Sequence, residues 1–191
     1  SLFSLTVISC AKKSSDDSKT TTDNTTTTTS SVSFVAVGNS GTILTSSDNG
    51  TTWTSRTSGT TNNLRRVTYG NGLFVTGGGS GTLLTSTDGT SWTARTSGTT
   101  NILYGVTYGN SIFVIGGTSG TILTSTDGTT WTARTSETSM TLLGVTYGNG
   151  LFVTVGNTGT ILTSTDGTSW TSRISGTTVN LENVIYKNEL F

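Results

Sequence analysis

The sequence repeats itself with a period of 39 residues, and every copy carries one tryptophan at the same place. The tryptophans are Trp53, Trp92, Trp131 and Trp170. Phenylalanines follow the same period, except that Asn49 is an extra residue in the first copy. A period of about 40 residues rich in strand formers is typical of repeat architectures, in which each repeat is one supersecondary unit that stacks on its neighbours. The repeat therefore limits the fold to a propeller or a solenoid.

One repeat, residues 142–180, contains four short segments rich in β-branched and aliphatic residues. The segments are 142–147, 151–155, 160–164 and 169–173. Tight-turn sequences separate them, including Gly148-Asn149-Gly150 and Asp166-Gly167, where glycine readily adopts the positive φ of a hairpin turn. Four strands joined by tight turns predict an all-β chain, a β-propeller of four-stranded antiparallel blades with about four blades. A β-solenoid is the alternative, but its coils are usually shorter and lack a hairpin turn at every connection.

The turn before each tryptophan carries a recurring motif. Residues 46–53 are Ser-Ser-Asp-Asn-Gly-Thr-Thr-Trp and match the pattern S-x-D-x-G-x-[ST]-W, and the other copies are one residue shorter between Asp and Gly. The motif resembles that of the Asp-box (BNR) repeat propellers, a group that includes bacterial sialidases and photosystem II assembly factors. The resemblance covers residues 34–191 and implies a fold rather than one activity. The predicted structural residues are Asp48, Trp53, Asp88, Trp92, Asp127, Trp131, Asp166 and Trp170.

Each of these residue types has a structural use in such a turn. An aspartate can accept hydrogen bonds from the N–H groups of the turn, and the tryptophan can cover its sheet against the next blade. The motif aspartates occur once per blade with no second carboxylate beside them, so they are not expected to bind calcium, which needs several converging oxygens.

The two ends of the repeat region bear on whether the ring closes. The first copy begins at a second strand, 34–38, and residues 181–187 repeat a first strand. A closed ring of four blades would pair 181–187 with 34–38. Otherwise the blades form part of a larger ring, or their open edges recruit other copies. Because Asp-box propellers usually have six or more blades, the resemblance favours the open or associating form.

Composition excludes several classes of function. The chain has 10 basic and 10 acidic residues and a formal net charge of zero, and it lacks the basic stripe that nucleic acid binding requires. It contains no histidine, so neither an imidazole base nor a histidine metal ligand is available. Neither a metal nor another cofactor is predicted.

The repetition itself argues against catalysis, which needs a few unlike groups brought together. Near-identical repeats instead place like groups in a circle. The recurring arginines are expected to be solvated on the outer strands, and the recurring tyrosines to lie in the core or line the channel. They are Arg56, Arg95, Arg134 and Arg173, and Tyr69, Tyr108, Tyr147 and Tyr186. We predict no catalytic residue and no enzymatic activity.

The N-terminal segment predicts a surface anchor. Residues 1–10 form a short apolar run, interpreted as a signal peptide remnant, that ends in Val7-Ile8-Ser9-Cys10 and resembles a bacterial lipobox, in which the cysteine receives lipid. Residues 11–33 are a Thr/Ser-rich segment with almost no apolar residues, which predicts a disordered tether. Together they predict a lipoprotein of the bacterial cell envelope, facing the periplasm or the exterior, with lipid on Cys10. The alternative is an unmodified cysteine in the tail.

Comparison of the four repeats with one another points to a ligand face. Differences cluster just before and within the first strand of each repeat, and these segments should all lie on one face around the propeller axis, opposite the motif turns. We predict that this face binds a protein or glycan. Its candidate residues are Asn62, Arg65, Arg66, Tyr104, Met140, Leu143, Glu182 and Asn183.

The leading hypothesis is therefore a non-enzymatic, surface-anchored propeller that binds a protein or glycan partner and touches membrane only through its lipid. One alternative is a sialidase-like glycan hydrolase, which would need a cluster of unlike Asp, Glu or Tyr, and Arg residues. The other is a structural or assembly protein that joins copies through open blade edges.

Overall fold

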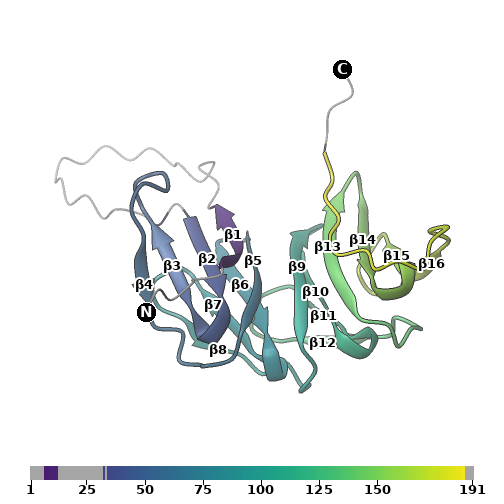
Figure 1. The fold of residues 1–191 in the computed structure, drawn as a ribbon, viewed down its shortest axis with the longest axis horizontal. Coiled ribbons are helices and arrows are strands. Elements are labelled where there is room, and N and C mark those ends of the chain that lie inside the picture. The colour runs from purple at the N-terminus through teal and green to yellow at the C-terminus, as the bar shows by residue number, and fades with distance from the viewer. Residues whose placement is uncertain (1–6, 13–31, 33, 188–191) are drawn as a thin grey trace.

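The computed structural model describes residues 7–12, 32 and 34–187 and forms four antiparallel sheets of four strands each (Figure 1). The first sheet contains β1 (Val7–Lys12), β2 (Phe34–Gly38), β3 (Ile43–Ser46) and β4 (Thr54–Arg56), and the second β5 (Leu64–Gly70), β6 (Leu73–Gly78), β7 (Leu83–Ser86) and β8 (Thr93–Ala94). The third contains β9 (Leu103–Gly109), β10 (Ile112–Gly117), β11 (Ile122–Ser125) and β12 (Thr132–Arg134), and the fourth β13 (Leu142–Gly148), β14 (Leu151–Gly156), β15 (Ile161–Ser164) and β16 (Thr171–Arg173). Each sheet follows chain order, so each is one blade. The predicted all-β propeller with about four blades is confirmed.

Short turns of the expected chemistry join the strands. Asn71 and Gly72, between β5 and β6, both have positive φ (48° and 72°), as a two-residue hairpin turn of this hand requires. A one-turn 3-10 helix joins the second strand of each blade to the third. These helices are η1 (Asn39–Gly41), η2 (Gly79–Gly81), η3 (Thr118–Gly120) and η4 (Asn157–Gly159). Local turn residues thus fix the hairpins of every repeat.

The blades stack along an arc, with their first strands β1, β5, β9 and β13 side by side in that order on the inner side. Three apolar interfaces hold neighbouring blades together, and each contains a phenylalanine with no exposed surface: Phe74, Phe113 and Phe152. Within the described part of the chain, no comparable packing joins β13 back to β1. Figure 1 shows the sheets in sequence along an arc whose two ends do not meet.

The pairing of residues 181–187 with 34–38 that a closed ring would need is not formed within the chain, in line with the open form that the resemblance favours. Strand β2 pairs instead with β1, in a register that sets Cys10 opposite Ala36 and Lys12 opposite Phe34. Residues 181–187 run along the other end of the arc, where the Leu181 N–H donates to the Gly156 carbonyl at 3.0 Å. The two segments that compete for the edge of β2 thus lie at opposite ends of an open arc, so the distant one cannot reach it.

Strand β1 crosses the boundary between the predicted signal remnant (1–10) and the predicted tether (11–33). Its ladder with β2 slips by one residue near the start, as in the other blades. Residues 1–6 and 13–31 lie outside the described part, and lipid on Cys10 stays a prediction. No helix among the described residues is both long and apolar enough to cross a bilayer.

Candidate ligand-binding face

An irregularity in three inner strands positions the candidate residues. The ladder between the first and second strands slips by one residue after Leu64, Leu103 and Leu142. The extra residues fall at the variable positions Arg65 and Leu143, and in the third blade the bulge contains Tyr104 and Gly105. A bulge leaves its extra residue unpaired and re-aims its side chain. The positions that differ between repeats therefore lie at the bulges, where a residue of the inner strand is not paired with the second strand.

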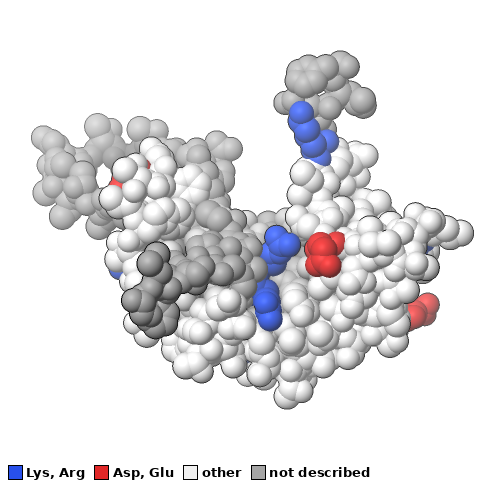
Figure 2. Space-filling model, in the orientation of Figure 1, with Lys and Arg blue, Asp and Glu red and all other residues white. Residues whose placement is uncertain are grey.

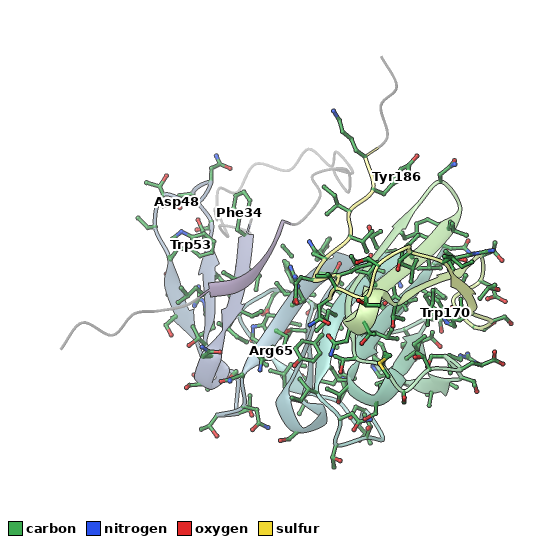
Figure 3. All side chains as sticks on the ribbon, turned by 45° about the vertical axis from the view of Figure 1, so that its right-hand side comes forward. Phe34, Asp48, Trp53, Arg65, Trp170 and Tyr186 are labelled. Atoms are coloured by element: carbon green, nitrogen blue, oxygen red, sulfur yellow. The ribbon has the colours of Figure 1, made fainter. Side chains whose placement is uncertain are left out.

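The bulge residues of neighbouring blades meet. The Arg65 guanidinium carbon lies 5.4 Å from the centroid of the Tyr104 ring, a cation–π distance. Arg65 stands on β5, at the middle of the arc (Figure 3). Its Nε atom is buried and has no hydrogen-bond partner. A buried donor without an acceptor is uncommon, because leaving it unpaired costs about 1–3 kcal/mol.

The repeat position of Arg65 and Tyr104 also occurs in the last blade and in the residues that follow it. We call Arg65, Tyr104, Leu143 and Glu182 the inner-strand row. Leu143 is half-buried and Glu182 is exposed, so the row runs from a cation through an aromatic and an aliphatic side chain to an anion. Figure 2 shows basic and acidic groups near each other at the middle of one face, with few other charges around them. The row is thus a narrow amphipathic strip of mixed charge.

Other predicted residues of this face have different surroundings. Arg66 is half-buried beside Arg65, and Asn183 is exposed and close to Gly144 of β13. The Asn62 side chain is engaged in structure, since its Nδ2 donates to Thr82 Oγ1 at 2.8 Å and so ties the incoming connection to the turn after η2. Met140 takes the place of this asparagine in the third repeat and is 38% exposed. Of the eight candidates, the structure therefore joins Arg65 and Tyr104 directly.

Sequence analysis did not foresee the bulge, although a signal was available. Leu64 and Val67 are three residues apart on one strand, and both are buried. Strict alternation places residues two apart on one face of a strand, so a spacing of three indicates an inserted residue between them. Leu103 and Val106, and Leu142 and Val145, repeat this spacing and burial.

The motif turns use their aspartates for hydrogen bonding within the turn. Asp88 Oδ1 accepts from the N–H groups of Thr90 and Ser91, each at 2.8 Å, and from Ser86 Oγ at 2.9 Å. In the longer first turn, Asp48 accepts instead from the N–H and the hydroxyl of Thr52. With their lone pairs engaged in this way, the carboxylates hold the turn rather than a substrate.

These bonds also keep the aspartates ionised. The hydroxyl and then the N–H of Thr52 lower the pKa of Asp48 from 3.8 to about 2. Thr129 and Thr168 lower the pKa values of Asp127 and Asp166 in the same way. Burial acts to raise the pKa of Asp88, but its hydrogen bonds outweigh burial and the pKa is lowered. Such carboxylates are poor proton donors at neutral pH. Among the described residues, no group of three or more His, Cys, Asp or Glu side chains is placed to hold a metal ion.

Trp92, Trp131 and Trp170 face the preceding blade, whereas the sequence suggested the next one. Trp92 packs with Phe74 of its own blade, at 6.4 Å between ring centroids, against an apolar cluster that includes Val35 of the first blade. The reason is that Trp92 and Phe74 lie on the same side of their sheet, the side turned toward the preceding blade. The indole Nε1 also donates to the carbonyl of Gly89 at 3.0 Å, which fixes the ring over the turn.

Three of the outer arginines, Arg56, Arg95 and Arg134, are half-buried and Arg173 is exposed, and each is tied to the third strand of its own blade. Arg95 Nε donates to Thr85 Oγ1 at 2.9 Å, and the same bond recurs at the other three arginines. An open polar groove of about 840 Å³ lies at the outer rim of the last blade, near Ser136, Thr160 and Arg173. None of its lining residues belongs to the inner-strand row. Similar grooves recur in other blades, so it is a product of the repeat geometry.

Comparisons with known proteins agree with this architecture. Residues 99–181 match the model of a family described as the DUF6242 beta propeller domain. Among solved structures, the chain is similar to YCF48 bound to a D1 peptide, with 18% identity and a TM-score of 0.67 over 94% of this chain and 56% of that one. It is also similar to the computationally designed Ika4 protein (13% identity, TM-score 0.61, 85% of this chain and 92% of that one). A GH74 enzyme of Niastella koreensis is similar too (22% identity, TM-score 0.53, 85% of this chain and 23% of that one).

No curated protein sequence matches the chain. At these identities the similarities establish the propeller fold. The chain spans little more than half the length of the YCF48 chain that it matches.

Proposed function

We propose that this chain is a non-enzymatic propeller that binds a protein partner, and that an extended acidic segment of the partner lies along the inner-strand row. The observation that carries the proposal is the contact between Arg65 and Tyr104 at two bulges, with Arg65 Nε buried and unpaired. A planar guanidinium already held by a cation–π contact with an aromatic ring is partly ordered before a carboxylate binds to it.

The charges of the row indicate which way such a segment would lie. Arg65 and Arg66 are adjacent, and neither forms an ion pair with a described residue, so together they attract carboxylates. Glu182, at the other end of the row, would repel them. A segment whose acidic residues lie near Arg65 and whose apolar residues follow along Leu143 fits this order. YCF48 has been solved with a D1 peptide, and this supports the choice of a protein segment over a glycan by analogy of fold.

Screening against an array of acidic peptides tests the proposal. Once a binding peptide is found, Arg65→Ala combined with Arg66→Ala should weaken binding by about tenfold or more, as expected for loss of a central arginine anchor. Arg65→Lys should lie in between, since it keeps the charge but loses the planar fork. Ser91→Ala, on the motif-turn side, is the control and should leave binding unchanged. If the arginine variants bind the peptide as well as wild type does, the peptide does not bind at the inner-strand row.

No observation on the described residues favours the sialidase-like alternative. The motif aspartates hold their turns, the outer arginines bond to threonines of their own blades, and neither set joins an unlike catalytic group. An assay of the purified chain against sialosides and β-glucans should therefore detect no turnover. Measurable hydrolysis that survives further purification would overturn the non-enzymatic assignment.

We also propose that the protein is held at a bacterial cell envelope by lipid on Cys10. The support is the sequence Val7-Ile8-Ser9-Cys10 and the polar segment after it. With a complete signal sequence supplied, the wild-type protein should partition into detergent on phase separation, and Cys10→Ser should stay in the aqueous phase. Equal partitioning of the two would exclude the anchor.

A further inference from the structure

The outer grooves recur with the repeat, but the residues that line them differ. The groove of the third blade, of about 790 Å³, runs along β12 and is bounded on its other side by residues 97–99 of the preceding blade. We call it the β12 groove. Trp131 lines it, whereas no described tryptophan lines the grooves of the first and fourth blades. Its volume is in the range of sites that bind small molecules, and an aromatic side chain is typical of such sites.

The connection that follows β12 is where the third repeat departs from the first two. Residues 57–62 and 96–101 are both Thr-Ser-Gly-Thr-Thr-Asn, whereas residues 135–140 are Thr-Ser-Glu-Thr-Ser-Met. Two of the changed residues, Glu137 and Ser139, line the β12 groove. The third repeat has therefore changed at residues that form this groove.

Glu137 stands at a position where the other repeats use glycine. Its φ is 57°, close to the values of 74°, 73° and 73° at the equivalent Gly59, Gly98 and Gly176. A residue with a Cβ is unfavourable in this left-handed region. The Glu137 side chain is exposed and forms neither an ion pair nor a hydrogen bond with another described residue. Because its carboxylate does not support the fold, the strained position points to a function in binding.

Trp131 gives the groove a rigid apolar surface. Its Nε1 donates to the Gly128 carbonyl at 3.0 Å, and its ring packs with that of Phe113 at 6.3 Å between centroids. The side chain is only half-buried, so part of the indole remains accessible at the groove. An indole held in this way can take part in binding with little loss of side-chain freedom.

The polar lining of the groove is also available for binding. Arg134 Nε donates to Thr124 Oγ1 at 2.9 Å, which leaves the two terminal nitrogens without an acceptor among the described residues. The hydroxyls of Thr135 and Ser139 are exposed and form no hydrogen bond within the described part of the chain. Arg134 and Glu137 are the charged residues of the lining, so its formal charge is zero.

We propose that the β12 groove binds a neutral oligosaccharide. A sugar ring has an apolar face of C–H groups, which suits the indole of Trp131, and hydroxyls around its edge. These hydroxyls can donate to the Glu137 carboxylate and accept from the Arg134 guanidinium. A lining with a positive and a negative group and no net charge favours a neutral ligand over a charged one. The groove shares no residue with the inner-strand row, so this proposal does not depend on the proposed function.

The lining fits binding of a sugar rather than its hydrolysis. Glycosidases generally use a pair of carboxylates on either side of the scissile bond. Among the described residues, Glu137 is the one carboxylate that lines the β12 groove. The oligosaccharide is therefore bound and released unchanged, in agreement with a non-enzymatic propeller.

Isothermal titration calorimetry with three linear neutral hexasaccharides tests the proposal: cellohexaose, mannohexaose and chitohexaose. The wild-type chain should bind at least one of them at millimolar concentration or below. Glu137→Gly should weaken this binding by about tenfold or more, because charge-assisted hydrogen bonds are lost. Its thermal unfolding temperature should not fall, because glycine suits the left-handed backbone. Glu137→Gln should lie in between, since its amide keeps hydrogen bonds without the charge.

Two further variants separate this site from the inner-strand row. Trp131→Phe keeps an apolar ring and should weaken sugar binding several-fold, with a thermal melt to check its folding. Arg65→Ala combined with Arg66→Ala should bind the sugar as wild type does. The proposal would be overturned if none of the three sugars binds, if Glu137→Gly binds as well as wild type, or if the arginine variant alone loses binding.

Discussion

At the scale of single residues, two positions carry backbone strain that the other repeats avoid. Ser111 and Glu137 adopt φ of 62° and 57°, in the left-handed region. Glycine occupies the same positions elsewhere, for example Gly72 for the first and Gly98 for the second. A side chain costs about 1–2 kcal/mol in this region because its Cβ crowds the following carbonyl. The repeats thus act as internal controls for one another.

Replacing Glu137 by glycine should stabilise the protein. We expect Glu137→Gly to raise the free energy of unfolding by up to about 1 kcal/mol, since relief of strain exceeds the added freedom of the unfolded chain. Chemical denaturation measures the change. Gly98→Ala is the matched control, because a Cβ there meets no other atom and acts through φ alone. It should destabilise by a similar amount, and a stabilising Gly98→Ala would contradict the explanation.

The turn carboxylates should give a defined dependence of stability on pH. The pKa of Asp48 is lowered in the folded state from 3.8 to about 2. Its contribution is therefore fully present above pH 3.8 and is lost as the pH falls through about 2. Asp48→Asn should be less stable than wild type at pH 7, and the difference should shrink as the pH falls from 4 to 2. Denaturation curves across this pH range measure the difference in stability. A difference that does not change with pH would mean that the ionised Asp48 carboxylate does not stabilise the turn.

At the scale of the element, local sequence was sufficient to place the strands. The segments 142–147 and 151–155 were predicted, and β13 and β14 cover Leu142–Gly148 and Leu151–Gly156. The fourth strand is shorter than predicted, because hydrogen bonds to Asp166 and Gly167 hold the chain in its turn through Trp170. The turn residues and the alternation of apolar and polar residues along a strand are local properties of the sequence, and both recur in all four repeats.

The partners of strands could not be predicted in this way. Whether β1 or residues 181–187 pairs with β2 depends on a competition between segments far apart in the chain. The contact between Arg65 and Tyr104 likewise joins two blades, so no single repeat contains it. Comparison of the repeats with one another located the variable positions of the candidate face, and its role in binding stays a prediction.

The position of a blade in the arc should determine how much its tryptophan contributes to stability. Trp170→Ala removes a side chain that is 8% exposed and packed between two blades, and should cost about 3–5 kcal/mol. Trp53→Ala removes the same side chain from an open end, where it is 41% exposed, and should cost clearly less. Urea denaturation at low protein concentration compares the two. Equal losses would mean that Trp53 is covered in solution.

At the scale of the whole molecule, contacts between neighbouring blades hold the arc together, as in other repeat proteins. Glycines of the inner strands set how closely these blades approach. A Cβ at Gly109 would overlap the ring of Tyr147, and a Cβ at Gly148 would overlap that of Tyr186. The first pair lies inside the arc, and the second lies at its end, where Tyr186 is 45% exposed.

These two glycines should therefore respond differently to the same substitution. Gly109→Ala should cost about 1–3 kcal/mol of stability by overpacking an interface between two complete blades. Gly148→Ala should cost less, because the terminal segment can move away from the added methyl group. Denaturation measures both, and the reverse order would show that residues 181–187 are held more firmly than the inner blades.

The course of β1 across Cys10 has a consequence for the order of events in a cell. A lipoprotein signal peptidase that cuts before Cys10 would separate Val7, Ile8 and Ser9 from the chain, and only Cys10 to Lys12 of the strand would remain. Before the cut, β1 would cover the edge of β2 along its length, and after the cut most of that edge would be open.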